Sequence, residues 1–166
     1  MGSIARLFRH LFAPGARRYF PMPALERIAQ AIAAAEARHT GEIRFAVESA
    51  MHPRAVLAGM PVRARAEEVF AQLRVWDTQA NNGVLLYLLL AEHRIEIVAD
   101  RGFRGRVTPE QWRGVCQRLE ERLRAGEHVE AVLQGLEGLS ALVEAHFPRT
   151  GGEADENELP DEPHLL

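Results

Sequence analysis

Two short polar segments carry the side chains best suited to bind a ligand. The first, with the sequence WDTQANNG, holds Asp77, Asn81 and Asn82, and the second begins with Asp100 and Arg101. Carboxylate and amide oxygens are ligands that calcium and other hard divalent cations take, and an arginine can bind an anion in two-point fashion. The sequence therefore predicts a metal site at Asp77, Asn81, Asn82 and Asp100, with Arg101 as an anion-binding residue.

The two segments flank a predicted β-hairpin, which would bring them together. Residues 84–90 are apolar on both faces, as in a central strand, and residues 94–99 alternate between apolar and charged side chains. A tight turn at residues 91–93 joins them, so the start of one strand should lie beside the end of the other. Asn82 and Asp100 should thus be neighbours. Three interpretations stay open: a structural Asn-Gly turn, a cation or polar-ligand site, and a catalytic centre.

The sequence offers no clear nucleophile. Cys116 and Arg122 have the C-x5-R spacing of cysteine-dependent phosphatases, but the residues between them are helix formers and include two glutamates. Cys116 also falls on the apolar stripe of its helix, which indicates a structural role. The seven histidines lack metal-ligand spacing, and we expect them at the surface or at helix ends.

The remaining periodicities predict the elements around the hairpin. Helices are expected to begin near Pro23, Pro61 and Thr108, the last through a Thr-Pro-Glu-Gln capping box, and a final helix ends before Pro148. Residues 42–48 alternate as a half-buried strand, with the charged side chains outside. The resulting order α-β-α-β-β-α-α predicts the α/β class, as a three-layer α/β/α sandwich around a small mixed sheet.

Charge divides the chain into a body and a tail. All 20 arginines lie within residues 1–149 with 17 of the 23 acidic residues, so the body carries +3 and residues 150–166 carry −6. We expect residues 21–148 to form the domain and residues 149–166 a disordered acidic tail, with masking of the basic body as an alternative. Residues 1–20 form a basic amphipathic segment that docks on its own domain or a second copy, or lies on an anionic membrane.

Composition excludes several classes of protein. A single cysteine rules out an internal disulfide or a cysteine-built zinc site, and the longest apolar run is far shorter than a spanning helix. No signal peptide is recognisable, which predicts a cytoplasmic protein, with peripheral contact at the inner membrane left open. Arg101, Arg104 and Arg106 surround only one aromatic residue, Phe103, so we expect no nucleic-acid partner.

The hairpin and its flanking loops resemble the TPM domain, a family of thylakoid lumen, photosystem II repair and acetylcholine-receptor modulator proteins. The resemblance rests on Trp76-Asp77, on Asn81-Asn82-Gly83 followed by Val-Leu-Leu, and on the arginine-led second strand with its polar turn. It extends over about residues 23–147 and indicates a short bacterial form without signal peptide or membrane helix. It implies an α/β/α sandwich, and the functions recorded for relatives are acid phosphatase activity, calcium binding and accessory roles near membrane complexes.

These observations lead to three functional hypotheses. The first is a non-catalytic TPM-like module that binds Ca²⁺ or another divalent cation, or a small polar ligand, at the paired loops and acts through a protein partner. The second is a metal-assisted, acid-phosphatase-like hydrolase of phosphomonoesters. The third is a scaffold that binds a membrane surface or a protein through residues 1–20. We expect no organic cofactor, and a homo-oligomer stays open.

Overall fold

The structure, a computed structural model, describes residues 2–152 and 156–166. The helices are α1 (Gly2–Leu11), α2 (Ala16–Tyr19), α3 (Met22–Glu36), α4 (Pro53–Leu57), α5 (Val62–Gln72), α6 (Pro109–Arg124) and α7 (His128–His146), with short 3₁₀ turns η1 (Leu90–Glu92) and η2 (Arg101–Phe103). The strands are β1 (Glu42–Glu48), β2 (Gly83–Leu89), β3 (Arg94–Ala99) and β4 (His164–Leu165). The predicted order of elements is confirmed from α3 to α7, with α1, α2, α4 and β4 in addition.

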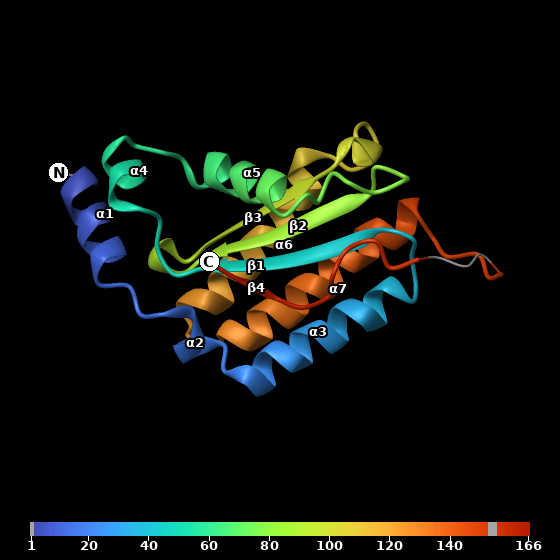
Figure 1. Cartoon of the computed structure of the whole chain (residues 1–166), viewed down its shortest axis with the longest axis horizontal. Coiled ribbons are helices and arrows are strands. Elements are labelled where there is room, and N and C mark those ends of the chain that lie inside the picture. Colours follow the sequence, from blue (N-terminus) through green and yellow to red (C-terminus); the bar gives the residue numbers. More distant parts are fainter. Residues whose placement is uncertain (1, 153–155) are drawn as a thin grey trace.

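The four strands form one mixed sheet in the order β3-β2-β1-β4. β1 pairs in parallel with β2 and with β4, and β2 pairs antiparallel with β3. Figure 1 shows α3, α6 and α7 against one face of this sheet and α5 against the other. The molecule is therefore the predicted three-layer α/β/α sandwich.

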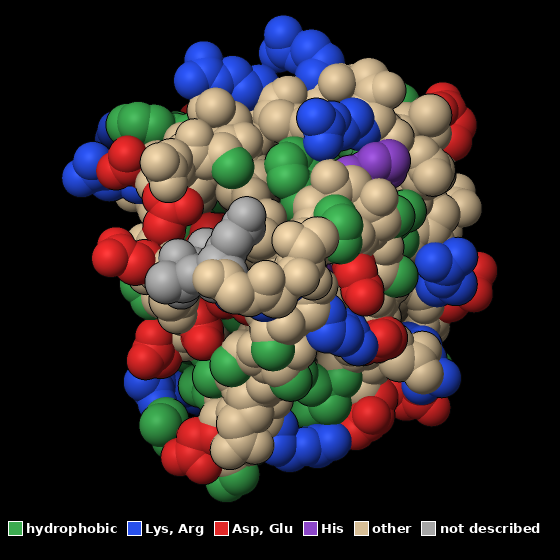
Figure 2. Space-filling view, turned by 90° about the vertical axis from the view of Figure 1, so that its right-hand side faces the viewer, with side chains coloured by type: hydrophobic (Ala, Val, Ile, Leu, Met, Phe, Trp, Pro, Cys, Tyr) green, Lys and Arg blue, Asp and Glu red, His purple; other side chains and the backbone are tan. Residues whose placement is uncertain are grey.

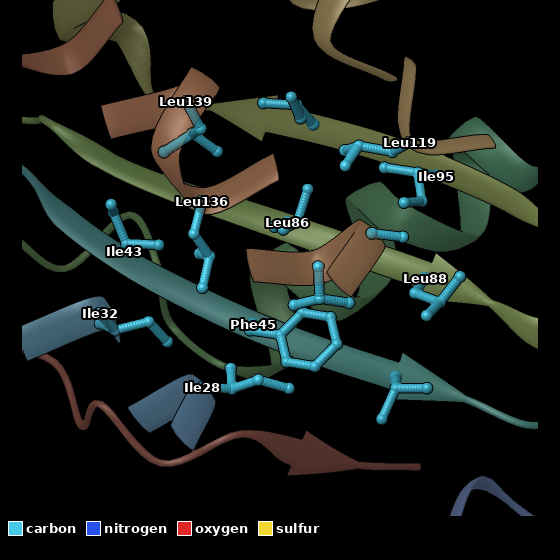
Figure 3. Packing of buried hydrophobic residues seen from close by; sticks show 14 of the residues in the cluster. Ile28, Ile32, Ile43, Phe45, Leu86, Leu88, Ile95, Leu119, Leu136 and Leu139 are labelled. Atoms are coloured by element: carbon cyan, nitrogen blue, oxygen red, sulfur yellow. The ribbon is translucent and has the colours of Figure 1, made fainter. Parts of the chain in front are cut away.

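The central strand β2 is buried on both faces, because its alternating side chains enter two separate cores. Leu86 and Leu88 pack with α3, α6 and α7, and Figure 3 shows them beside Phe45 and Leu136. Leu85 and its alternate neighbours point the other way, towards α5. The doubly apolar pattern of this segment thus predicted its place in the sheet correctly.

Strand β1 differs from the prediction of a half-buried strand, because all seven of its residues are buried. Glu48 accepts a hydrogen bond from the Tyr87 hydroxyl at 2.5 Å, and Arg65 of α5 contacts both of its carboxylate oxygens at 2.9 and 3.0 Å. Arg44 donates to the backbone carbonyl oxygens of Pro160 and Glu162. The charged side chains of β1 are buried because other elements supply partners for them, which the local alternation cannot reveal.

The acidic tail also differs from its prediction, since residues 156–166 are ordered along the outer edge of β1. β4 pairs with Ala46 and Val47, Leu159 is buried, and the Leu159 amide donates to the Glu42 carboxylate at 3.1 Å. Backbone pairing to an open edge strand, together with these polar contacts, orders a segment that has few apolar side chains. Residues 153–155 of the predicted tail lie outside the described residues.

Glu36, at the end of α3 where the tail docks, has a carboxyl group with a strongly shifted pKa. It accepts a hydrogen bond from the Ile43 amide at 2.7 Å and lies near Glu42 and Asp161. Burial, and then the two neighbouring carboxylates, raise the pKa of Glu36 to about 8. Glu36 is therefore protonated in the folded protein at neutral pH, where an unfolded chain would have lost this proton.

We predict that the free energy of unfolding decreases as pH rises from 6.5 to 8. In this window the folded state still binds the Glu36 proton and the unfolded state does not, so deprotonation favours unfolding. Glu36→Gln keeps an oxygen that can accept the hydrogen bond from the Ile43 amide but carries no charge. It should flatten this slope and stabilise the protein at pH 8 by about 1 kcal/mol or more, because one pKa unit corresponds to about 1.4 kcal/mol.

The measurement is urea-induced unfolding at several pH values, with exposed Glu26→Gln of the same helix as the matched control. The buried His39, whose pKa is lowered to about 4 by burial, gives the opposite slope only below pH 6.5. Equal slopes for the Glu36→Gln variant and the unsubstituted protein above pH 6.5 would contradict the assignment.

Candidate functional site

The hairpin brings the two polar loops together, as predicted. The Asp100 amide donates to the Gly83 carbonyl oxygen at 2.9 Å, and the Gly102 amide donates to the Asn81 carbonyl oxygen at 2.8 Å. Arg101 adds a side-chain link, since its Nε donates to Asn81 Oδ1 at 2.8 Å. Figure 2 looks onto this end of the molecule, where basic side chains gather along the upper edge.

Asn82 is the most buried of the predicted site residues. Asn82 is 1% exposed, and its side-chain Nδ2 donates to the Thr40 carbonyl oxygen at 2.9 Å. Its backbone amide donates to Thr78 Oγ1 at 3.1 Å. Asn82 therefore ties the loop before β2 to the loop before β1. Its Oδ1 is buried and has no hydrogen-bond partner among the described residues.

Asp100 caps the short turn η2 that follows β3. Its Oδ1 accepts from the Arg101 amide at 2.7 Å, which is the hydrogen bond of an N-cap. Its Oδ2 is buried and, within the described part of the chain, also lacks a hydrogen-bond partner. Both loops thus hold a buried side-chain oxygen with free hydrogen-bonding capacity, and such orphan oxygens are uncommon in folded proteins.

Asp77 has separate contacts from the other predicted ligands. Its carboxylate forms an ion pair with Arg74 at 2.6 Å, and both side chains are more than half exposed. Arg74 has a positive φ of 54° and also lies over the Trp76 ring. The structure joins Asn81 to Arg101 directly and brings Asn82 close to Asp100 along the hairpin, whereas it places the Asp77 carboxylate against Arg74.

The donor atoms at the two loops are chemically suited to a hard cation but contribute little charge. Asn81, Asn82 and Asp100 supply amide, carboxylate and carbonyl oxygens, which is the donor set that calcium prefers. In the part of the chain that the structure describes, no group of three or more His, Cys, Asp or Glu side chains could hold a metal ion. A cation at the loops would therefore be bound by one carboxylate and neutral oxygens.

The tail contributes a contact to the same loop that sequence reasoning missed. The Glu158 carboxylate accepts a hydrogen bond from the Gln79 amide at 2.9 Å. The missed signal was Leu159, the apolar residue that follows and that is buried against the α5 side of the sheet.

A groove of about 810 Å³ begins beside Asp100 and Arg101 and continues along the outer edge of β3. Its lining is rich in arginine, namely Arg63, Arg94, Arg101, Arg104 and Arg113, and Arg63 donates to the Ile97 carbonyl oxygen at 2.6 Å. The groove lies between β3 and α6, so these arginines come from four parts of the sequence. Their convergence could not be predicted from sequence spacing.

Cys116 lines this groove and is half-buried in it. Burial, followed by the charges of Glu96 and Glu120, raises the pKa of the Cys116 thiol to about 12. The thiol therefore stays protonated at neutral pH and is a poor nucleophile. Its helix also begins at the predicted Thr108–Gln111 capping box, so no phosphate-binding loop precedes Arg122.

The fold is an α/β/α domain in which a β-hairpin brings two polar loops together at one edge of the sheet. Residues 22–142 match the TPM domain family, and the chain belongs to that family. A similar solved structure is the NMR structure of the BA42 protein from the psychrophilic bacterium Bizionia argentinensis. It shares 25% sequence identity with this chain, has a TM-score of 0.74, and the match covers 87% of this chain and 93% of that one.

No curated protein has a significant sequence match to the chain. Among the helices that the structure describes, none combines the length and the apolar character needed to cross a membrane. The family match begins at α3 and ends within α7, so α1, α2 and β4 lie outside it.

We predict that Gly102→Ala separates the two loops. A Cβ at this position would overlap the Asn81 carbonyl oxygen, so the loops must move apart or the hydrogen bond between them must break. The free energy of unfolding should fall by about 1–3 kcal/mol. Gly114→Ala is the matched control in α6, where a Cβ has open space, and it should stabilise the helix by up to about 1 kcal/mol. Equal stability of the Gly102→Ala variant and the unsubstituted protein would contradict the close approach.

Proposed function

We propose that this TPM domain is a non-catalytic module that binds a divalent cation of the calcium type at the paired loops and acts through a protein partner. The observation that carries the proposal is the pair of buried oxygens, Asn82 Oδ1 and Asp100 Oδ2, without hydrogen-bond partners in the described chain. Such atoms lose their hydration on folding and gain nothing in return unless a ligand contacts them. A cation would use the carboxylate and amide oxygens present at both loops.

Asp77 has a secondary place in this proposal. Its carboxylate can reach a cation only after it leaves Arg74, and the ion pair between them is exposed and therefore weak. Because Asp100 supplies the only carboxylate that is already free of an ion pair in these loops, we expect low affinity, on the order of 10⁻⁴–10⁻³ M.

Calorimetric titration with CaCl₂ tests the cation site. We expect binding in the range given above, a loss of affinity of at least about tenfold in Asp100→Asn, and a smaller loss in Asp77→Asn. Asp77→Asn is the matched control, since the same change is made in the adjoining loop. Absence of binding heat at millimolar calcium, or an equal loss in both variants, would contradict this site.

The arginine-rich groove favours a second candidate function, the hydrolysis of phosphomonoesters with the help of a metal. The groove joins the proposed cation site at Asp100 and Arg101. Arg63 and Arg94 are paired with Glu96 and Glu120 of the lining, so Arg101, Arg104 and Arg113 are the guanidinium groups that suit a phosphate dianion. In this arrangement Arg101 would bind phosphoryl oxygens beside a cation on Asp100. Cys116 would take no part, because its thiol is protonated.

An assay with p-nitrophenyl phosphate tests this second function. Hydrolysis should require a divalent cation, should be abolished by chelation, and should fall at least about tenfold in Arg101→Met, because a bidentate phosphate contact is lost. Cys116→Ser is the matched control and should keep full activity. Hydrolysis that persists in the chelated protein would assign the activity to another site.

A further inference from the structure

Helix α1 is attached to the domain by its polar side. Arg6 donates from Nε to the Glu92 carboxylate and from Nη2 to the Met60 carbonyl oxygen, both at 2.7 Å. His10, which was expected at the surface, is 5% exposed; its Nε2 lies 2.9 Å from the same carboxylate and its Nδ1 accepts from the Met51 amide. These four hydrogen bonds fix which side of α1 faces the protein.

The attachment persists at neutral pH. Burial raises the pKa of Glu92, but hydrogen bonds from His10 and Arg6 outweigh this effect, so the pKa lies below its usual value. The carboxylate is therefore charged and paired with Arg6. Around it, α1 packs on α4 and on η1, and the left side of Figure 1 shows α1 beside α4.

This attachment turns most of the apolar stripe of α1 outward, while Leu7 packs against the core on the α5 side of the sheet. Ile4, Phe8, Leu11 and Phe12 are 65%, 55%, 55% and 76% exposed, and they are four of the eight large apolar residues exposed in the described chain. Phe8 and Phe12 stack on each other at 6.0 Å between ring centroids rather than on the domain. The adjacent helix α4 adds Leu57, which is 58% exposed. An amphipathic helix normally buries its apolar side, so this one presents a docking surface.

The charge around this surface indicates a negatively charged occupant. Residues 1–25 contain four arginines and no aspartate or glutamate. Arg6 is paired with Glu92, whereas Arg9, Arg17 and Arg18 are exposed. A second copy docked through the same surface would bring identical basic rows together, which disfavours self-association. An anionic lipid surface instead accepts both the apolar stripe and the arginines.

We propose that α1 binds this protein to the surface of an anionic phospholipid membrane. The helix has 10 residues and is too short to span a bilayer, so it would lie in the plane of the interface with Phe8 and Phe12 at the level of the headgroups. Arg17 and Arg18 of α2 would contact lipid phosphates. The domain keeps its structure on binding, because the polar side of α1 stays on Glu92.

Co-sedimentation with vesicles tests the proposal on the full chain. We expect binding to vesicles of equal parts phosphatidylglycerol and phosphatidylcholine, and little binding to pure phosphatidylcholine or at about 0.5 M NaCl, where charges are screened. The double variant Phe8→Ser/Phe12→Ser should reduce the bound fraction at least about tenfold. Arg17→Gln/Arg18→Gln should reduce it on anionic vesicles in particular. These side chains are exposed, so circular dichroism should show an unchanged fold.

Trp76→Ser is the matched control, because Trp76 is 48% exposed but precedes β2, at the opposite end of the sheet from α1. This variant should bind vesicles like the unsubstituted protein. Equal binding by the double phenylalanine variant, or no binding to anionic vesicles, would overturn the proposal. So would a dimeric mass in light scattering that becomes monomeric in the double variant, since the surface would then belong to a second copy.

Discussion

The complete burial of β2 is the constraint on which the rest of the molecule depends. None of its seven residues is exposed, and their side chains enter two cores that no single layer of helices could cover. One layer must come from α3, α6 and α7 and the other from α5. Because β2 also pairs with β1 and β3, its position fixes both neighbouring strands and the polar loop that precedes it. Hydrophobic burial of one strand therefore determines where the candidate site lies.

Those parts of the fold that depend on local patterns could be predicted from the sequence. The doubly apolar run of β2, the alternation in β3 and the capping box at Thr108 each involve residues close together in the chain. The burial of Glu48 could not be predicted, since it depends on Arg65 and Tyr87 from other elements. That residues 156–166 are ordered could not be predicted for the same reason, because their contacts are with an edge strand far away in the sequence.

In the candidate site, too, the backbone pairing could be predicted from the sequence and the side-chain contacts could not. Hairpin pairing made the approach of residues 81–82 to residues 100–102 predictable, because an antiparallel register places the two ends side by side. The direction of each side chain was not predictable. Asp77 turns to Arg74, whose left-handed backbone conformation is unusual for a residue other than glycine. The arginine-rich groove likewise needs the packing of α6 on β3, which no spacing in the sequence encodes.

The docking of β4 on β1 has a consequence for the order in which the sheet is completed during synthesis. Ala46 lies near the middle of an early strand, yet its outer neighbour is His164, more than a hundred residues later. β1 can pair with β2 only after residue 89 has left the ribosome. Its other edge stays open until residues 156–166 emerge. The outer edge of β1 thus stays unpaired in a nascent chain until β4 docks on it, and an unpaired edge strand is prone to intermolecular strand pairing.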